Sequence, residues 1–231
     1  MSERWRDIPG WFDDELAEVY RHAVTRAVDG SRFVEVGCYL GRSTTFLIDE
    51  MRRQGKRITL WIVDNFSGIS PEHAHLYPEK SHLTAFLNNL PDCHGLNVNV
   101  HPGESVDIAK QFANDSLDFV FLDADHSYEA VMADIIVWLC KVKPGGILTG
   151  DDYSHCFPGV IRAVDELLGE EVMAPFGPRK SFNRSWLYNK PVKTVEKQVD
   201  QGPRCSCGAP LPTRCGACLA SRIFQNANGD L

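Results

Sequence analysis

Strand-like and helix-like segments alternate along most of this chain, and the alternation limits the folds it can adopt. Short apolar runs occur at residues 32–36, 58–64, 96–100, 117–123 and 145–151. Segments with helical periodicity follow these runs, at residues 41–54, 82–90, 105–113, 127–142 and 159–168. Runs that are apolar almost throughout are typical of parallel strands covered on both faces. The pattern therefore predicts an α/β fold with a doubly wound, Rossmann-like sheet.

The two ends of the chain differ from this middle part. A helical pattern at residues 13–28 precedes the first strand. Two last apolar runs, 172–176 and 184–190, are separated by a short link and predict a hairpin at one sheet edge. Beyond about residue 190 the sequence is polar and rich in Pro, Gly and Cys. We expect an N-terminal helical cap over 1–29, one α/β domain over 30–190, and a linker with a Cys-rich tail over 191–231.

Charge and composition exclude several functions. The 231 residues carry a net charge of −7, which argues against nucleic acid or an anionic membrane as the main partner. No apolar run approaches the ~20 residues of a membrane span. The first ten residues, MSERWRDIPG, lack the apolar core of a signal peptide. We expect a cytoplasmic protein without a nucleic-acid or membrane partner.

The stretch FVEVGCYLGRST, residues 33–44, leads from a strand through a glycine turn into a helix. Gly37 allows a sharp turn and a close ligand approach, and Gly41 allows close packing at the helix start. The spacing E-x-G-x-x-x-G matches neither the usual dinucleotide motif nor a phosphate loop. Glu35 ends the strand, and a carboxylate there suits an ammonium group better than a pyrophosphate.

Asp64 ends the second strand, 23 residues after Gly41. An acid at that place can accept hydrogen bonds from both hydroxyls of a ribose. Glu35 and Asp64 together favour a nucleoside that carries an amino acid, which is S-adenosylmethionine. The alternative is that the two glycines only make a tight connection, and the position of Asp64 argues against it.

Residues 30–190 resemble the class I S-adenosylmethionine-dependent methyltransferases. The chain is most similar to the metal-dependent O-methyltransferases of small molecules, such as those of catechols and macrolide sugars. The resemblance implies a seven-stranded sheet with an antiparallel last strand. It implies that Glu35 lies near the methionine part of the cofactor, Asp64 at the ribose, and the G-E-S after the third strand at the adenine. The expected cofactor-binding residues are Glu35, Gly37, Gly41, Ser43, Asp64, Gly103, Glu104, Ser105 and Asp123.

Three acids follow the fourth and fifth strands. Asp123 ends the fourth strand, and Asp151 and Asp152 end the fifth. If these strands are neighbours, the three carboxylates converge, and a divalent cation would remove their repulsion. Oxygen ligands favour Mg²⁺ or Mn²⁺ over Zn²⁺. The metal-dependent relatives carry acids at these places, although relatives without a metal also exist.

His126 follows Asp123 by three residues, at the expected start of a helix. The helix dipole disfavours its protonation, whereas nearby acids favour it. We expect a neutral imidazole that acts as general base toward a substrate hydroxyl, and the expected catalytic residues are His126 and the metal ligand Asp123. The alternative is that His126 only decorates a turn. Asp125 and Ser127 are expected to cap the helix.

These residues predict metal-assisted O-methylation of a small hydroxylated acceptor, such as a sugar, a polyketide or a phenolic metabolite. Two alternatives stay open: a metal-free N-methyltransferase, and a non-catalytic nucleoside-binding or interaction protein. The long segment 65–82 suits a lid over the acceptor. The N-terminal Trp5, Trp11 and Phe12 either staple the first helix to the domain or contact the pocket. A homo-oligomer is also left open.

The tail contains four cysteines within 14 residues, in a C-x-C and a C-x-x-C pair: Cys205, Cys207, Cys215 and Cys218. Four thiolates at this spacing can wrap one structural Zn²⁺. The alternative is a tail of reduced thiols without metal. The family resemblance does not extend to this segment.

Overall fold

The structure is a computed structural model that describes residues 3–67, 82–169, 172 and 185–192. The chain divides into two compact units, Met1–Lys190 and Pro191–Leu231, and every described helix and strand belongs to the first. The four tail cysteines and most of the expected lid segment lie outside the described residues. Among the described helices, none has the length and apolarity that crossing a membrane requires.

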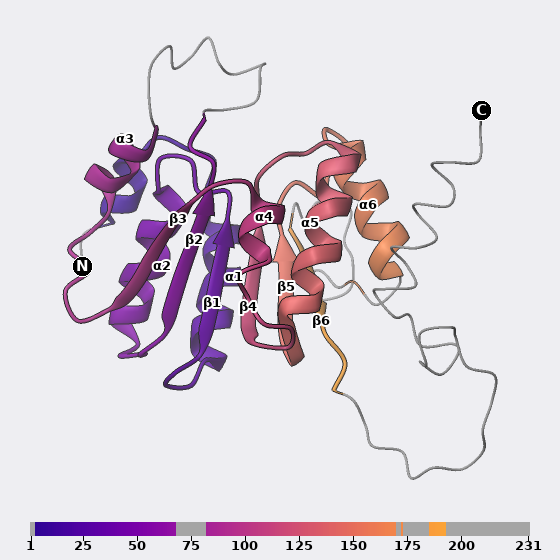
Figure 1. The fold of residues 1–231 in the computed structure, drawn as a ribbon. Helices are drawn as coiled ribbons and strands as arrows, with labels where there is room; N and C mark the ends of the chain where they lie inside the picture. Colours follow the sequence, from indigo (N-terminus) through magenta and orange to yellow (C-terminus); the bar gives the residue numbers. More distant parts are fainter. Residues whose placement is uncertain (1–2, 68–81, 170–171, 173–184, 193–231) are drawn as a thin grey trace, which may run out of the picture. The chain divides into compact units, whose positions relative to one another are not determined.

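Helices and strands alternate as expected (Figure 1). The described strands are β1 (Arg32–Val36), β2 (Thr59–Asp64), β3 (Asn97–Pro102), β4 (Leu117–Leu122), β5 (Val142–Gly150) and β6 (Trp186–Asn189). The described helices are η1 (Arg4–Asp7), α1 (Asp14–Arg26), α2 (Arg42–Arg53), α3 (His82–Asn89), α4 (Ser105–Ala109), α5 (Tyr128–Lys141) and α6 (Pro158–Leu168).

The strands form one sheet in the order β3-β2-β1-β4-β5-β6. The first five are parallel, and β6 runs antiparallel to β5. The predicted doubly wound sheet with an antiparallel C-terminal strand is therefore confirmed. The described residues contain six strands rather than the expected seven, because the run 172–176 lies outside them apart from Val172. The expected hairpin is therefore untested.

One helix is shorter than its sequence pattern predicts. The expected helix at 105–113 ends at Ala109, and tighter turns continue the chain through Phe112. In those turns each N–H donates to the carbonyl three residues back, as from Phe112 to Ala109 at 3.1 Å. The Phe112 ring then packs edge-on against Trp61 of β2, with a centroid distance of 5.5 Å. Core packing thus decides where this helix ends.

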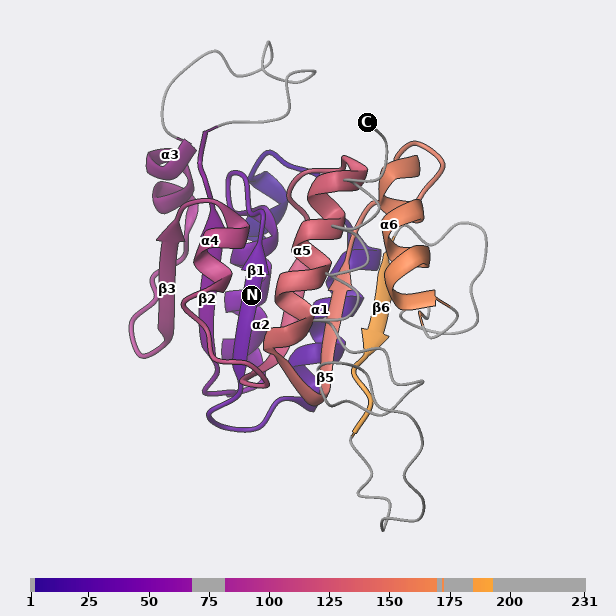
Figure 2. The ribbon, with the colours of Figure 1, turned by 45° about the vertical axis from the view of Figure 1, so that its right-hand side comes forward.

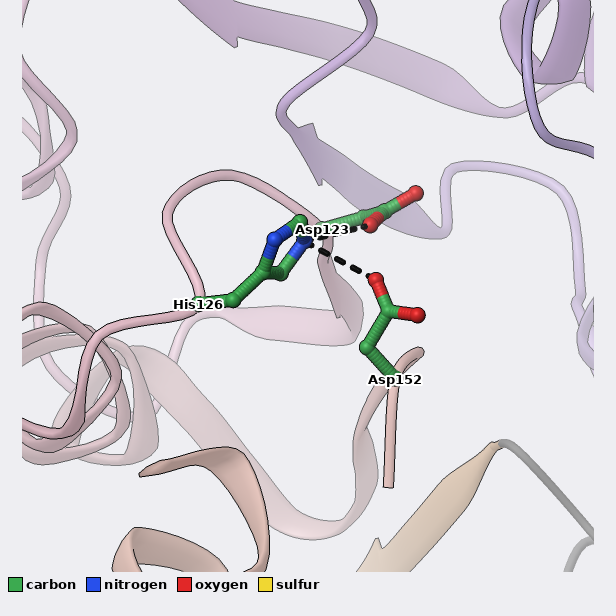
Figure 3. Close-up of side chains that lie close together, drawn as sticks. All are labelled: Asp123, His126 and Asp152. Atoms are coloured by element: carbon green, nitrogen blue, oxygen red, sulfur yellow. Dashed lines mark ion pairs between the residues drawn. The ribbon is translucent and has the colours of Figure 1, made fainter. Parts of the chain in front are cut away.

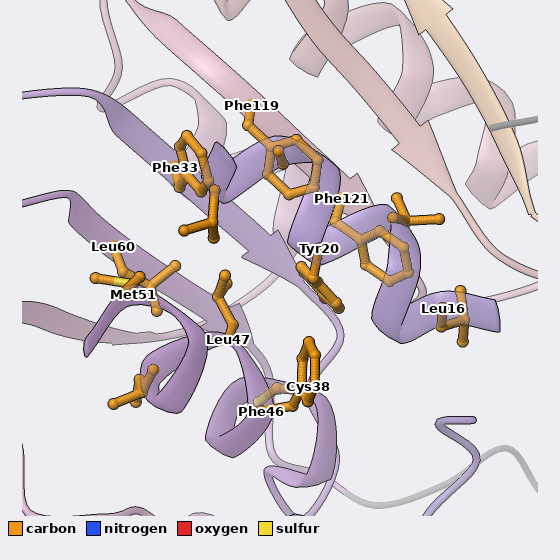
Figure 4. Close-up of a cluster of buried hydrophobic side chains, with 14 of the residues drawn as sticks. Leu16, Tyr20, Phe33, Cys38, Phe46, Leu47, Met51, Leu60, Phe119 and Phe121 are labelled. Carbon is orange, nitrogen blue, oxygen red and sulfur yellow. The ribbon is translucent and has the colours of Figure 1, made fainter. Parts of the chain in front are cut away.

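Helices cover both faces of the sheet, α1 and α2 on one side and α4 and α5 on the other (Figures 1 and 2). On the first side, Tyr20 of α1 packs on Phe119 and Phe121 of β4, with centroid distances of 5.9 and 4.9 Å. Figure 4 shows this cluster between α1, α2 and the sheet. Each fully buried aromatic ring of this kind stabilises the fold by about 1.5–3 kcal/mol.

The N-terminal segment is held by aromatic packing. Trp5 and Phe12 are buried and pack on Phe46 of α2 at centroid distances of 5.4 and 5.3 Å. These two side chains confirm the expected staple. Trp11 differs, because 52% of it is exposed and its ring lies 5.6 Å from that of Tyr39 in the glycine turn.

Candidate active site

The glycine turn after β1 depends on two residues with left-handed backbones, Gly37 at φ 80° and Gly41 at φ 87°. A Cβ on Gly37 would lie 2.0 Å from the carbonyl oxygen of Asp123. A Cβ on Gly41 would lie 2.9 Å from the ring of Phe86. The predicted sharp turn and close packing are both present. The backbone of Asp123, just after β4, occupies the space that a side chain at position 37 would need. The absence of a side chain on Gly37 therefore lets the turn pack directly on Asp123.

Asp64 ties the end of β2 to the same turn. Its Oδ2 accepts hydrogen bonds from the backbone N–H groups of Cys38 at 2.8 Å and Tyr39 at 3.1 Å. Its Oδ1 accepts from the N–H of Phe66 at 2.7 Å. Tyr39 has a φ of 48°, a backbone conformation that a non-glycine residue keeps only when its surroundings enforce it. The carboxylate of Asp64 is therefore part of what shapes the turn.

Glu35 is completely buried beneath the turn. Its carboxylate accepts hydrogen bonds from the Tyr20 hydroxyl at 2.9 Å and the Thr44 hydroxyl at 2.5 Å. Burial raises the pKa of Glu35 to about 7, against the hydrogen bonds from Ser43, Thr44 and Tyr20, which lower it. No sequence motif indicated that Tyr20 and Thr44 would hold this carboxylate. Their signal was weak, because a tyrosine on an apolar helix face and a threonine in a first helical turn are common in any core.

Residues Gly103, Glu104 and Ser105 follow β3 and lie against the end of β2. The Gly103 N–H donates to the carbonyl of Asp64 at 2.9 Å, and Asn65 donates to Glu104 at 3.2 Å. These contacts place the predicted ribose and adenine residues side by side at one edge of the sheet. Ser105 also contacts two buried residues of α5, which no sequence motif had indicated.

The ends of β4 and β5 bring Asp123, His126 and Asp152 together (Figure 3). His126 Nε2 lies 2.9 Å from Asp152 Oδ2 and 3.7 Å from Asp123 Oδ1. Asp152 has a φ of 61°, and its side chain is mostly buried. Backbone strain of this kind gathers at functional sites, and here it aims a carboxylate at the imidazole.

These three residues offer ligand atoms within 4.8 Å of one another, which suits a cation. The predicted metal ligands were Asp123, Asp151 and Asp152. Among the described residues, the cluster contains His126 in place of Asp151. Asp151 is buried and lines a small adjoining pocket together with Asp123 and His126. Its role as a ligand stays a prediction.

The imidazole of His126 lies in a strongly negative environment. Burial by itself lowers the pKa of His126, but the hydrogen bonds and charges of Asp123 and Asp152 outweigh it and raise the value to about 10. The ring is therefore protonated at neutral pH in this arrangement, whereas a neutral ring was expected. The two carboxylates together act more strongly on this pKa than burial does.

The remaining residues of this loop have structural contacts. Asp125 accepts a hydrogen bond from the backbone N–H of Ser127 at 2.6 Å, as a turn-forming acid does. Ser127 occupies the N-cap position of α5, but its side chain makes no capping hydrogen bond, so that part of the expectation was wrong. The Tyr128 hydroxyl donates to Glu166 of α6. The Phe157 ring packs on His126 at a centroid distance of 4.6 Å.

This fold and the edge on which these residues gather define a class of protein, the methyltransferases with a doubly wound sheet. Residues 34–153, more than half of the chain, match the methyltransferase domain family, and the chain belongs to that family. The kinship to class I S-adenosylmethionine-dependent methyltransferases, predicted from the sequence, is thereby confirmed.

Solved structures share the fold. The O-methyltransferase NovP is 22% identical with a TM-score of 0.59, over 77% of this chain and 80% of that chain. An rRNA methylase from Streptococcus thermophilus is 14% identical with a TM-score of 0.55, over 79% of this chain and 99% of that chain. At such identities the likeness establishes the fold alone. The sequence is also similar to the uncharacterized protein R132 of Acanthamoeba polyphaga mimivirus, with 28% identity over 158 residues. The match covers 66% of each chain, so this chain spans slightly less than two thirds of the length of R132.

Proposed function

We propose that the chain transfers a methyl group from S-adenosylmethionine to a hydroxyl group of a small molecule, with the help of a divalent cation. The observation that carries the proposal is the position of Asp123, His126 and Asp152. They lie at the carboxyl edge of β4 and β5, in contact with the glycine turn through Gly37. Ligands of doubly wound sheets bind at this edge.

The residues beside the turn suit the cofactor, which when bound supplies an electrophilic methyl group. Asp64 offers carboxylate oxygens to the ribose hydroxyls, and its side chain is only half-buried. Glu35 has no exposed surface, so it would act on the cofactor without direct contact. Its negative charge would attract the cationic end of the cofactor, and its hydrogen bonds hold Ser43 and Thr44 in place. Ser105 would contact the base of the cofactor.

The cluster of Asp123, His126 and Asp152 suits a cation as well. Its two carboxylates are the ligands that Mg²⁺ and Mn²⁺ prefer. A divalent cation, when bound, lowers the pKa of a hydroxyl group beside it. His126 would take the hydroxyl proton at Nε2, and it can do so only as a neutral imidazole. The negative field of Asp123 and Asp152 must therefore be compensated before His126 acts as a base.

Two aromatic rings lie near the proposed site, and one of them, Trp11, favours an acceptor with a flat apolar or sugar-like surface, such as a sugar, a polyketide or a phenol. Trp11 is more than half exposed and lies against Tyr39, beside the glycine turn. An exposed indole face at such a place suits contact with an apolar or sugar-ring surface. Phe157 packs on His126 and keeps the imidazole oriented.

Calorimetry with S-adenosylhomocysteine and NAD, followed by methyl-transfer assays on sugar, polyketide and phenolic acceptors with Mg²⁺ or EDTA, tests the proposal. We expect binding of S-adenosylhomocysteine only, and turnover that EDTA abolishes and excess Mg²⁺ restores. Preferential binding of NAD would refute the cofactor assignment. Turnover of a hydroxyl acceptor that is insensitive to EDTA would refute the role of the cation.

A metal-free N-methyltransferase is the second candidate, and one observation favours it. Asp123 and Asp152 both face Nε2 of His126, and they raise its pKa to about 10, so this pair of carboxylates favours a cationic nitrogen. The same pair of carboxylates would hold a protonated substrate amine. This candidate predicts methylation of amines that is unaffected by EDTA. Binding of S-adenosylhomocysteine with no turnover of either acceptor class would favour the non-catalytic alternative.

A further inference from the structure

Arg42 attaches the N-terminal arm, residues 3–13, to the start of α2. Its Nη1 donates hydrogen bonds to the backbone carbonyl of Gly10 at 3.1 Å and, over a longer 3.4 Å, to that of Ile8. The carbon of its guanidinium group lies 5.5 Å from the centre of the Trp5 ring. Arg42 is the first residue of α2, so it comes directly after the glycine turn in which the cofactor is proposed to bind.

The charge of Arg42 does not stabilise the helix that it begins. A positive charge at a helix N-terminus opposes the helix dipole, and the first turn of α2 contains no acid that would offset it. The Nε atom of Arg42 is buried and has no hydrogen-bond acceptor within the described part of the chain. An unpaired N–H of a charged group is costly to bury. The contacts that offset these costs lie outside the helix, at the carbonyl groups of the arm.

The hydrogen bond to Gly10 fixes the direction in which the arm continues. The Gly10 carbonyl belongs to the peptide unit that joins Gly10 to Trp11, and this unit is planar. Gly10 has a φ of 147°, and a glycine by itself leaves the backbone free to rotate at this point. A Cβ on Gly10 would lie 3.5 Å from Cβ of Arg42 and 3.6 Å from the ring of Tyr39, so the arm passes close to the turn. Holding the peptide unit here also orients Trp11.

Trp11 has aromatic packing on one side and solvent on the other. Its ring lies 5.6 Å from that of Tyr39 at an interplanar angle of 36°, and 52% of the residue is exposed. Ring packing is favourable over a wide range of centroid distances, whereas a hydrogen bond weakens steeply when its angle changes. Arg42 therefore supplies the directional contact that the packing of Trp11 on Tyr39 lacks.

We infer that Arg42 is a positioning residue, which holds the peptide unit between Gly10 and Trp11 so that the Trp11 ring faces the methyl acceptor. The inference rests on the proposed function, in which Trp11 contacts the acceptor, and it adds the residue that keeps this contact in place. Arg42 itself acts through Trp11 and touches neither the acceptor nor the cofactor. The acceptor contact is thereby supported by the same helix that begins at the proposed cofactor turn.

Fluorine NMR of the full chain tests whether Arg42 holds Trp11, and it needs no acceptor. Labelling with 5-fluorotryptophan gives a signal for each of the five tryptophans, and Trp11→Phe assigns that of Trp11. In Arg42→Gln we expect the Trp11 signal to move toward that of free 5-fluorotryptophan, because the Gly10 carbonyl loses its charged donor. Arg42→Lys keeps a charged donor and should keep the signal closer to its wild-type position. Arg53→Gln is the matched control and should leave the signal unchanged, since Arg53 also belongs to α2 but pairs with Glu50.

Kinetics and calorimetry on the same variants test what this position does for the reaction. With the acceptor of highest turnover in the assays proposed above, Arg42→Gln should raise KM for the acceptor about 2- to 10-fold, the range expected for one aromatic contact. The value of kcat and the affinity for S-adenosylhomocysteine should both stay within about twofold, because the lost contact binds the acceptor alone. Arg42→Lys should give an intermediate KM, and it serves if Arg42→Gln does not fold. Arg53→Gln should keep the wild-type KM.

An unchanged Trp11 signal or an unchanged KM in Arg42→Gln overturns the inference. So does a loss of affinity for S-adenosylhomocysteine larger than the rise in KM, which would make Arg42 a cofactor residue. Each of these results leaves the proposed function intact, because the wild-type chain still transfers the methyl group. A wild-type chain that methylates none of the acceptors refutes the proposed function itself, and the inference with it.

Discussion

At the scale of single residues, the pKa of His126 tests the arrangement of the carboxylate cluster most directly. Its Nε2 faces Asp152 at 2.9 Å and Asp123 at 3.7 Å, and the pKa is raised to about 10. We expect NMR titration of the metal-free protein to show an imidazole that stays protonated well above pH 7. Asp152→Asn should lower its pKa by about 1–3 units, since an opposite charge at this range has that effect.

Added Mg²⁺ should lower the same pKa, because a cation between the carboxylates competes with the imidazolium. Asp165→Asn is the control: this carboxylate belongs to α6 and accepts a hydrogen bond from Tyr153, so the substitution should leave the titration of His126 unchanged. A wild-type midpoint near 6.5 in chelator would contradict the arrangement of the cluster.

Glu35 makes stability depend on pH in a predictable direction. Its pKa is raised from 4.5 in the unfolded chain to about 7 in the folded one, so folding favours the protonated carboxyl group. The stability that this proton contributes is complete below pH 4.5 and is lost as the pH rises through 7. Relative to Glu35→Gln, the wild type should therefore lose on the order of 3 kcal/mol between pH 4.5 and 8.

Thermal melts of both proteins across this range measure the difference. Only its change with pH is diagnostic, because the substitution also alters the hydrogen bonds to Tyr20 and Thr44. A difference that stays constant from pH 4.5 to 8 would show that the carboxyl group of Glu35 is not buried as described.

The turn between β1 and α2 controls the site at the scale of elements. Gly37→Ala would place a Cβ 2.0 Å from the Asp123 carbonyl oxygen, whereas Gly30→Ala, at a φ of 87°, meets open space. Both variants carry the left-handed strain of about 1–2 kcal/mol. We expect Gly37→Ala to lower the melting temperature further and to weaken binding of S-adenosylhomocysteine. Equal effects of the two variants would mean that the turn does not pack on β4.

The N-terminal segment contains two tryptophans with different roles, a buried one that stabilises the fold and an exposed one. Trp5→Ala removes a buried ring packed on Phe46 and should cost about 3–5 kcal/mol of stability. Trp11→Ala should leave the melting temperature nearly unchanged and raise KM for the acceptor several-fold. Kinetics and thermal melts on both variants test this division. An unchanged KM in Trp11→Ala would exclude contact between this ring and the acceptor.

The order and type of the elements followed from sequence patterns, because apolar runs and helical periodicity are local signals. The 127–142 pattern corresponds to α5 (Tyr128–Lys141), and the 41–54 pattern to α2 (Arg42–Arg53). The pattern at 105–113 overran α4, since the end of that helix depends on where Phe112 meets Trp61. That contact joins distant segments and leaves no local signature.

The Cys-rich tail raises a separate question at the scale of the whole molecule. Cys205, Cys207, Cys215 and Cys218 lie outside the described residues, and we propose that they bind one structural Zn²⁺. Deleting residues 193–231 should remove one equivalent of zinc per chain and leave binding of S-adenosylhomocysteine unchanged. Metal analysis and calorimetry of the two proteins check this. Equal zinc content in both would rule out the tail as the zinc site.

The sequence by itself determined the class of the sheet and the strand ends at which acids and glycines occur, whereas the antiparallel last strand was implied by the family resemblance. These features arise from local periodicity and from the rule that parallel strands present their carboxyl ends at one edge. Family membership followed from the same residues, Glu35, Gly37, Gly41 and Asp64.

Only the tertiary structure decided which of these residues meet and in which protonation state. It brought Asp123, His126 and Asp152 together, and the two carboxylates raise the pKa of the imidazole to about 10. It also joined Ser105 to Asp134 and Trp138, residues about thirty positions away. Distances and burial set pKa values and hydrogen-bond directions, and both depend on contacts between segments that are far apart in the chain.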